Sequence, residues 1–263
     1  MNKTQIIARD IRKDVLDMCF HAHVGHIGPA LSIVDILTVL YFDTLKVNPS
    51  NPTNPNRDRF ILSKGHAAAA LFAVLSKKGY FSSKLLMTFC MPSGAFGDHP
   101  DYNPKFGIEL TTGSLGHGLS VGSGMAMGLP ASKIFVLLSD AELDEGSVWE
   151  AIMFAGHHHL SNLTIIIDDN GQQAFGKTCD VLDTRPLDKK LPTFGWQVST
   201  VNGHDHKALH SALTKSHPRH PHCIIAKTVC GYGVSFMEHK IEWHYFPMNG
   251  QQHTQALKEI QSI

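Results

Sequence analysis

Two polar side chains follow apolar runs that are typical of buried strands. Asp140 comes after the run 134–138, and Asn170 comes after the run 163–167. A helical stretch, 146–159, separates the two runs. Because the carboxyl ends of parallel strands share one edge of a sheet, where open α/β folds bind ligands, we expect both side chains to lie together. A carboxylate, an amide and a nearby backbone carbonyl are hard oxygen ligands, suited to Mg²⁺ or Ca²⁺ that also binds water and phosphate. The spacing predicts a site for a metal-bound diphosphate.

The elements expected around this site alternate between helix and strand. Apolar residues at three- and four-residue spacing predict a first helix over 2–22, and a second apolar helix is expected over 31–45. Alternating strands and helices imply a mostly parallel sheet with helices on both faces, an α/β three-layer sandwich. We treat 1–263 as a single domain. The remaining expected elements are a strand at 60–62, a strand at 196–200, a helix at 206–216 and a strand at 222–228.

The bulk composition excludes several classes of function. The chain has 23 basic and 23 acidic residues, so its formal net charge of zero gives no electrostatic reason to bind nucleic acid or an anionic membrane. Its five cysteines are odd in number and form no C-x-x-C pair, which disfavours disulfides and zinc and favours the cytoplasm. No signal sequence opens the chain, and no apolar run approaches ~18 residues. We expect a cytoplasmic protein without a membrane segment.

Several further motifs occur in a fixed order around the metal motif, and with them the sequence resembles the diphosphate-binding half of transketolase. The resemblance covers about residues 5–250, nearly the whole chain. It implies the thiamine-diphosphate-binding fold. The motifs are Gly25-His26-Ile27-Gly28, the segment 58–66, Asp98-His99-Pro100, the segment 111–116, Ser139-Asp140-Ala141-Glu142 with Glu145 and Glu150, Asp168-Asp169-Asn170, Gly195-Trp196, Asn202-Gly203-His204-Asp205 and Trp243-His244.

The resemblance assigns a metal and a cofactor. It implies that Mg²⁺, or Ca²⁺ or Mn²⁺ in its place, is bound by the Asp140 carboxylate, the Asn170 amide and the Gln172 backbone carbonyl. The metal would hold the diphosphate of thiamine diphosphate. The positions assigned to cofactor binding are His66, Gly113, Ser114, Leu115, Asp140, Ala141, Glu145, Asn170 and His244.

The resemblance also sorts the histidines, of which the chain has 18. His66 and His244 match positions near the cofactor diphosphate and the reacting end of the sugar. His26 and His99 match residues that bind the hydroxyls of the donor ketose, and imidazole can donate to or accept from such groups. With Glu145 these four are the candidate catalytic residues. Glu145 and Glu150 match acidic residues that link two active sites across a dimer. His157, His158 and His159 are expected only to close a helix.

The family needs a glutamate beside the pyrimidine ring of the cofactor, and it lies on a second domain. The chain stops at Ile263, where that pyrimidine-binding domain would begin. We therefore expect the amino-terminal subunit of a split transketolase, which transfers a two-carbon ketol unit from a ketose to an aldose only with a partner subunit. That partner would carry the pyrimidine-binding and carboxy-terminal domains. The expected assembly is a heterotetramer of two such subunits and two partners, acting on sugars or sugar phosphates.

Two departures from the family pattern keep alternatives open. Ala141 stands where the family has glycine after the metal aspartate. If that position needs φ > 0, alanine costs about 1 kcal/mol and weakens cofactor binding roughly tenfold. His23, Val24 and Ile27 differ in the expected donor pocket. One alternative is a different thiamine-diphosphate enzyme, such as a ketol synthase or the α subunit of a 2-oxo-acid dehydrogenase. The other is a degenerate subunit that binds but does not catalyse. The glycines of 113–118 do not follow the dinucleotide-binding pattern.

Overall fold

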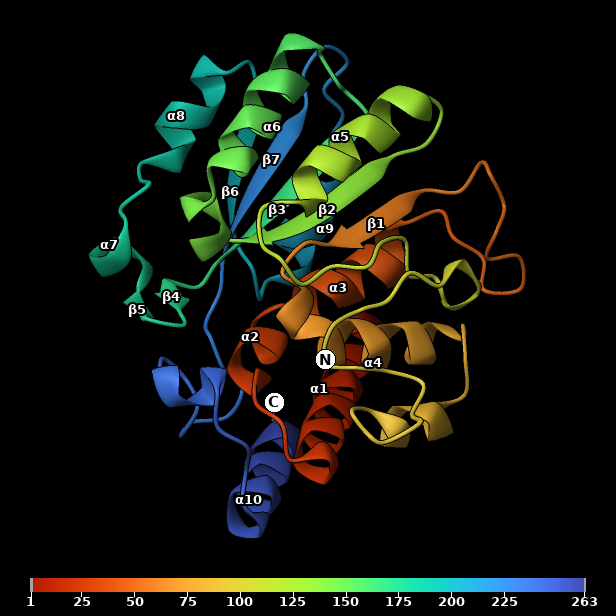
Figure 1. Cartoon of the computed structure of the whole chain (residues 1–263), viewed down its shortest axis with the longest axis vertical. Coiled ribbons are helices and arrows are strands. Elements are labelled where there is room, and N and C mark those ends of the chain that lie inside the picture. Colours follow the sequence, from red (N-terminus) through yellow and green to blue (C-terminus); the bar gives the residue numbers. More distant parts are fainter. Residues whose placement is uncertain (1, 263) are drawn as a thin grey trace.

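A parallel sheet of five strands forms the centre of the molecule (Figure 1). The computed structural model describes residues 2–262. Within them the strand order is β1-β2-β3-β7-β6, and each neighbouring pair is parallel, as the alternating pattern predicts. A separate antiparallel pair, β4 and β5, follows β3. The strands are β1 (Arg59–Leu62), β2 (Ile134–Ser139), β3 (Leu163–Asp169), β4 (Gln172–Gln173), β5 (Gly176–Lys177), β6 (Gln197–Asn202) and β7 (His222–Lys227).

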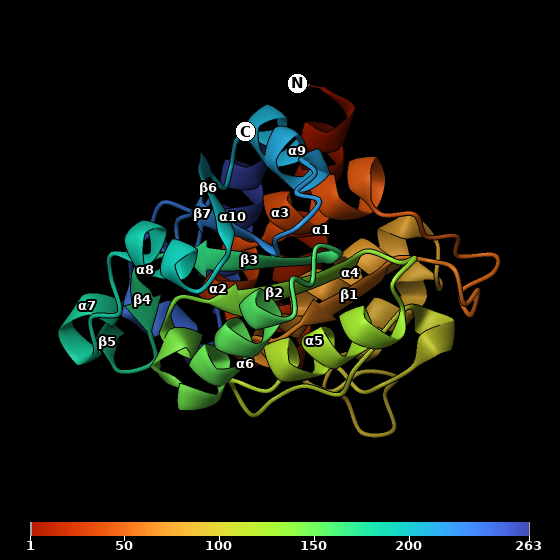
Figure 2. The same cartoon turned by 90° about the horizontal axis from the view of Figure 1, so that it is seen from above.

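Helices cover both faces of the sheet, so the expected three-layer sandwich is confirmed (Figure 2). In β2, Phe135 and Leu137 belong to one core, and Val136 and Leu138 belong to the other, because successive side chains of a strand point to opposite faces. One core is built with α1 (Lys3–Ala22), α2 (Ile27–Ser32), α3 (Val34–Val39), α4 (Ala68–Lys78), α9 (His206–Thr214) and α10 (Gly250–Gln261). The other is built with α5 (Gly118–Gly128), α6 (Gly146–His157) and α8 (Leu187–Thr193); the short α7 spans Thr178–Val181.

The first helix begins directly after a capping residue. Asn2 is the N-cap of α1: its side chain accepts a hydrogen bond from the Gln5 backbone, and the Gln5 side chain accepts one from the Asn2 backbone. The buried positions Ile11, Val15 and Met18 keep the predicted helical spacing. The helix ends at Ala22 and is followed by the C-cap residue His23, whose backbone is left-handed. The first predicted helix is thus confirmed to within one residue.

The second predicted helix, 31–45, is wrong in its extent. The chain turns helical already at Ile27, and the segment divides into α2, α3 and a π-helix over Leu40–Thr44. Pro29 lies in the first turn of α2, where a missing N–H breaks no helical bond, so the sequence Ile27-Gly28-Pro29 starts a helix rather than preceding one. Ser32 is the last residue of α2.

Other boundaries shift by one or two residues, as helix and strand ends commonly do. The helix predicted over 146–159 ends at His157, because His159 has a left-handed backbone with φ 51°. His157 therefore closes α6, while His158 and His159 lie beyond it. The strands expected at 196–200 and 222–228 are β6 and β7. Within residues 2–262 no helix is both long and apolar enough to cross a membrane.

Candidate active site

The carboxyl ends of β2 and β3 bring the two predicted metal ligands together. Ser139 is the register partner of Asp168, and the Asp140 backbone N–H donates to the Asp168 carbonyl at 3.2 Å. The Gly171 N–H, next to Asn170, donates to the Asp140 carboxylate at 2.9 Å. The parallel pairing deduced from the sequence therefore places both loops at one edge of the sheet.

Asp140 is buried and lacks a cationic partner. Its carboxylate accepts hydrogen bonds from the Gly171 N–H and the Thr178 hydroxyl, both at 2.9 Å, and from the Ala141 N–H at 3.0 Å. Burial, followed by the charge of the nearby Asp168, raises the pKa of Asp140 to about 7. Among the ion pairs of residues 2–262, none includes Asp140. A bound cation would supply the positive charge that this carboxylate lacks.

The other two predicted ligands lie on the same turn. The Asn170 amide nitrogen donates to Asp168 at 2.9 Å, which turns the amide oxygen the other way, and that oxygen accepts the Gln172 N–H at 2.9 Å. Gln172 opens β4 and lines the main cavity together with Asn170. In the described part of the chain, no three His, Cys, Asp or Glu side chains gather as an ion site. The available metal ligands are isolated oxygen atoms. They fit Mg²⁺, which also keeps water and phosphate ligands, better than they fit Zn²⁺.

A buried ion pair, which was not predicted from the sequence, contacts the turn that holds Asn170. The Lys64 ammonium lies 2.6 Å from the Asp168 carboxylate, and both side chains are almost completely buried. Asp168 also accepts hydrogen bonds from the hydroxyls of Ser32 and Thr228. Burial acts to raise the pKa of Asp168, but the Lys64 charge and these hydrogen bonds hold it below its usual range. The sequence pattern that could have indicated this ion pair is the presence of two charged residues, Lys64 and Asp168, at the ends of apolar strands.

The four candidate histidines gather around one cavity of about 460 Å³. The ring centroid of His26 lies 5.3 Å from that of His66, 5.4 Å from that of His244 and 6.3 Å from that of His99. These four histidines come from segments that are distant in the sequence, and the backbone N–H of His26 donates to the backbone carbonyl of His244 at 2.9 Å. His26 itself has a left-handed backbone, φ 61°, an uncommon conformation that is enriched at functional sites. The predicted grouping of these histidines is present.

Three of these imidazoles are held in the neutral form near pH 7. Burial lowers the pKa of His244 to about 4, helped by the nearby His26 and Lys64. Burial and then Lys64 lower the pKa of His66 well below its usual value, and burial lowers the pKa of His26. A neutral imidazole has one N–H donor and one acceptor nitrogen, so each ring can both give a hydrogen bond to a hydroxyl and receive one. The cavity is chemically suited to a polyhydroxylated ligand.

A buried carboxylate, Glu142, fixes the glycine loop against the metal turn. Its oxygens accept the Gly116 N–H at 2.8 Å, the Ser139 N–H at 3.3 Å and a short hydrogen bond from the Ser63 hydroxyl. Gly116 has φ 85°, and a Cβ there would lie 2.5 Å from the Ser147 hydroxyl. Glycine is therefore required at this position. The sequence analysis quoted Glu142 but assigned it no role.

Only some of the residues assigned to cofactor binding in the loops line the cavity. Gly113 and Leu115 line the cavity, whereas Ser114 between them is exposed and does not. Glu145, the N-cap residue of α6, lines the cavity with its side chain exposed. Glu150 lies further along α6, exposed and away from the cavity lining. Asp144 and Gln173 also line the cavity and were not predicted from the sequence. The Gln173 side-chain amide donates a hydrogen bond to the Asp144 carboxylate at 3.1 Å.

Ala141 does not carry the backbone strain that its position suggested. It begins a 3₁₀-helix over Ala141–Asp144 and is not among the non-glycine residues with positive φ in the described chain. The condition under which alanine would cost about 1 kcal/mol is therefore not met. Ala141 lines the cavity, and its N–H donates to the Asp140 carboxylate. The expected tenfold loss of cofactor affinity through strain has no basis in this backbone.

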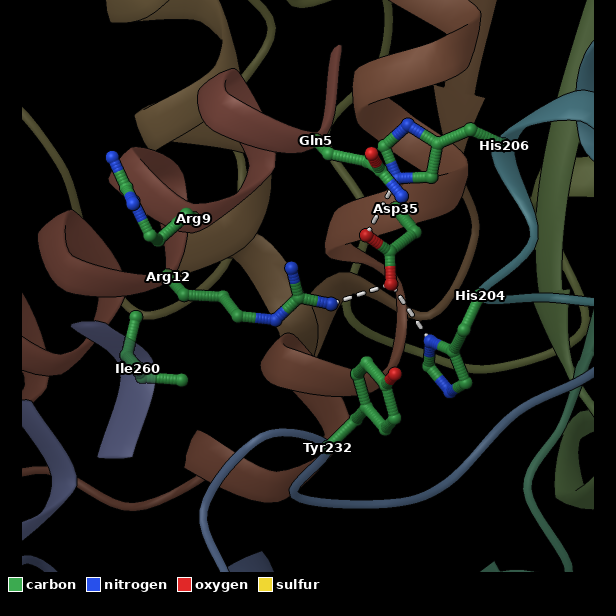
Figure 3. Close-up of a pocket in the computed structure, with 8 residues that line it drawn as sticks. All are labelled: Gln5, Arg9, Arg12, Asp35, His204, His206, Tyr232 and Ile260. Atoms are coloured by element: carbon green, nitrogen blue, oxygen red, sulfur yellow. Dashed lines mark hydrogen bonds and ion pairs between the residues drawn. The ribbon is translucent and has the colours of Figure 1, made fainter. Parts of the chain in front are cut away.

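His204, from the motif 202–205, belongs to a different network. His204 lines a cavity of about 80 Å³, and the hydrogen-bond network is centred on Asp35, which lines the same cavity (Figure 3). The Asp35 carboxylate is 2.5 Å from Arg12, 2.7 Å from His204 and 2.9 Å from His206. Although burial acts to raise the pKa of Asp35, Arg12 and the two histidines hold it far below its usual range. His204 Nε2 accepts the Val229 N–H at 3.0 Å, so this network joins α1, α3 and the segment after β7.

Comparison with known proteins decides the family. A family model described as the thiamine diphosphate binding domain of transketolase matches residues 3–261. The chain belongs to the transketolase family. The resemblance noted in the sequence is confirmed over almost the whole chain, and the family's domain is one described as binding thiamine diphosphate.

Relatives of similar length are described as subunits of transketolases. The chain is 38% identical to the 6-deoxy-6-sulfo-D-fructose transketolase subunit SqwG of Clostridium sp. (strain MSTE9), over 97% of this chain and 94% of the relative. It is 40% identical to one subunit of the apulose-4-phosphate transketolase of Actinobacillus succinogenes, over 96% of this chain and 94% of the relative. The sequence relationship therefore extends to transketolases divided into subunits.

Solved transketolases share the fold. The transketolase of Campylobacter jejuni superposes with a TM-score of 0.90 at 32% identity, over 99% of this chain and 43% of that one. The enzyme of Leishmania mexicana gives a TM-score of 0.91 at 26% identity, over 99% of this chain and 42% of that one. The chain thus spans about two fifths of these transketolases.

Proposed function

We propose that this chain is the diphosphate- and metal-binding subunit of a two-chain transketolase. In this proposal it forms one domain and moves a two-carbon ketol unit from a ketose to an aldose only with its partner. The observation that carries the proposal is the buried Asp140, which has no cationic partner within residues 2–262 and whose neighbours Ser139 and Ala141 line the cavity of the four histidines. A metal-bound diphosphate and a sugar are the ligands that these two features fit.

The chain's own residues would bind and orient the ligands. Asp140, Asn170 and the Gln172 carbonyl would hold Mg²⁺, whose charge offsets the buried carboxylate and the diphosphate. Thiamine diphosphate, when bound, supplies an electron sink that allows a carbon–carbon bond beside a carbonyl to break. Gly113 and Leu115 offer a close-fitting wall for its rings. Glu145 is proposed to contact the second active site across a dimer.

The four cavity histidines would bind the sugar and exchange protons with it. His26 and His99 are proposed to bind hydroxyls of the donor ketose, and His66 and His244 to lie nearer its reacting end. A neutral ring can accept a hydroxyl proton as a carbonyl forms and return it when the new bond is made. The lowered pKa values of His26, His66 and His244 keep their acceptor nitrogens free at pH 7.

The partner is proposed to carry the rest of the active site. The solved transketolases are more than twice as long as this chain, and the similar relatives are described as subunits. We propose a partner with the pyrimidine-binding domain and the glutamate that activates the cofactor. A heterotetramer of two of each chain, in the cytoplasm, is the proposed assembly. The names of the relatives cite different sugars, so we propose a substrate class, a ketose donor with an aldose acceptor.

Three observations favour this proposal over the alternatives. Two relatives, at 38% and 40% identity, are described as transketolase subunits rather than as 2-oxo-acid dehydrogenases. The alternative of a degenerate binding subunit rested on Ala141, whose backbone carries no strain. The ligand positions Asp140 and Asn170 and all four cavity histidines are intact.

Calorimetric titration of thiamine diphosphate into the assembled complex, with Mg²⁺, tests the site. We expect saturable binding that Asp140→Ala abolishes and that EDTA abolishes in the unmodified protein. Asp188→Ala removes an exposed carboxylate from α8 and is the matched control, with affinity unchanged. Equal affinity in the Asp140→Ala variant would refute the assignment of the metal site.

A further inference from the structure

Another cavity lies at the opposite edge of the sheet from the histidine cavity. Its volume is about 170 Å³, and it lies among the residues that precede or begin three parallel strands. Lys133 directly precedes β2, Asn162 directly precedes β3, and His222 is the first residue of β7. Because the strands are parallel, this edge is remote from Asp140 and Asn170, which follow the carboxyl ends of β2 and β3. The proposed catalytic role uses none of these residues.

Nine of the twelve residues that line this cavity have side chains able to donate a hydrogen bond, and the other three are Pro130, Ala131 and Leu213. Two lysines, Lys133 and Lys215, and two histidines, His217 and His222, line it, together with hydroxyl groups. Of the residues that line it, none is acidic. His222 is only 3% exposed, and its Nε2 is 2.9 Å from the Ser199 hydroxyl. The hydroxyl groups belong to Ser132, Ser161, Thr164 and Ser216.

The charges that act on the two histidines all have the same sign. Burial lowers the pKa of His222 to about 4, and the nearby His217 and Lys215 act in the same direction. Burial also lowers the pKa of His217, followed by the effects of Lys215 and His220. Asp58, which does not line the cavity, accepts the backbone N–H groups of Lys133 and Lys46 with its carboxylate. The cavity therefore has a positive potential without a neutralising carboxylate in its wall.

One polar atom of this cluster has no partner. His217 Nε2 is buried and makes no hydrogen bond within the described chain, and the His217 ring centroid lies 4.5 Å from that of His222. An unsatisfied buried nitrogen costs free energy of about 1–3 kcal/mol by general experience. A ligand with several acceptor oxygens would satisfy His217 and the two lysines together.

We propose that this cavity binds the phosphate group of a small anion, either inorganic phosphate or a compact phosphate monoester. Two lysines supply positive charge, while the histidine and hydroxyl groups supply directed donors, a combination typical of phosphate sites. The volume is below the ~300 Å³ at which pockets for larger ligands begin, so a nucleotide does not fit. The site is separate from the proposed diphosphate site and does not depend on the proposed reaction.

Histidine ring signals in NMR spectra of the full chain provide the test. Inorganic phosphate is titrated at constant pH and constant ionic strength, with chloride as the balancing salt. We expect the signals of His217 and His222 to shift and saturate, while those of exposed His157 do not. In the double variant Lys133→Ala/Lys215→Ala we expect at least a tenfold weaker affinity. Both lysines are exposed, so the variant is expected to fold with an unchanged Tm.

The matched control is the double variant Lys105→Ala/Lys258→Ala, which removes the same charge from positions elsewhere and should bind like the unmodified chain. Glycerol phosphate is titrated in parallel, and tighter binding of one of the two probes identifies the source of the phosphate group. Unchanged affinity in Lys133→Ala/Lys215→Ala would overturn the proposal. Shifts that chloride reproduces at equal ionic strength, or that never saturate, would overturn it as well, because they would reflect general screening.

Discussion

The Lys64 ammonium lies 2.6 Å from the Asp168 carboxylate, and this buried pair lies next to the proposed metal turn. Asp168 in turn accepts the Asn170 amide N–H at 2.9 Å. The orientation of one proposed metal ligand therefore depends on a buried ion pair, of which Lys64 also lines the histidine cavity. Because Lys64 and Asp168 come from the ends of β1 and β3, the pair also ties two strands of the sheet together.

Lys64→Ala is expected to destabilise the chain by about 3–5 kcal/mol, since it leaves the Asp168 charge buried without a partner. Urea unfolding at pH 7.5 measures the loss. Lys77→Ala is the control: Lys77 pairs with Asp10 at a similar distance of 2.7 Å, but both side chains are about one third exposed. That variant should lose no more than ~1 kcal/mol. Similar losses in the two variants would show that burial of the Lys64 pair has been misjudged.

Ala141→Gly tests the absence of backbone strain at the metal turn. Because Ala141 lies in a right-handed 3₁₀-helix, glycine should relieve nothing and should cost ~0.5–1 kcal/mol of stability through its greater freedom in the unfolded chain. Affinity for thiamine diphosphate, measured by calorimetry, should change by less than about threefold, which corresponds to ~0.7 kcal/mol. A gain of tenfold or more would mean that the alanine methyl group obstructs the cofactor.

The cavity histidines predict a pH dependence of stability. In the unfolded chain a histidine gains its proton near pH 6.5, whereas burial holds the folded-state pKa of His244 at about 4. The folded state therefore binds fewer protons between these values, and its stability falls as pH drops from about 6.5 towards 4. His26 and His66 shift in the same direction and add to the effect.

Urea unfolding at pH 7.5 and pH 5.0 measures this dependence. In His244→Gln the loss of stability between the two pH values should be smaller by ~1–2 kcal/mol than in the unmodified chain. His157→Gln, which alters an exposed histidine at the end of α6, should leave the loss unchanged. An unaltered loss in His244→Gln would contradict a neutral, buried His244.

Much of the fold follows from local sequence patterns. The apolar runs at 134–138 and 163–167 end within two residues of β2 and β3, and their parallel pairing places Asp140 beside the Asn170 turn. The division of 31–45 into several helices could not be predicted from hydrophobic periodicity, because every residue from Ile27 to Leu40 is buried and the segment has no exposed face.

The candidate site was only partly accessible from the sequence. Four histidines were selected by resemblance alone, since nothing in their spacing shows that His26 and His244 meet through a backbone hydrogen bond. Glu142 and Lys64 were missed because their roles arise from contacts with residues 26 and 104 positions away. The backbone conformation of Ala141 also depends on tertiary context, so the strain expected from a missing glycine could not be judged in advance.

The most direct test of the central claim is ketol transfer by purified chains, measured alone and after mixing. The partner chain is the one that carries the pyrimidine-binding domain. We expect no transfer by either chain alone, transfer on mixing that rises to a plateau at equal amounts of the two, and a requirement for thiamine diphosphate and Mg²⁺. Asp140→Ala should abolish transfer without preventing assembly. Full transfer by this chain alone, or a stable mixed complex that binds the cofactor but transfers from no ketose, would contradict the proposed function.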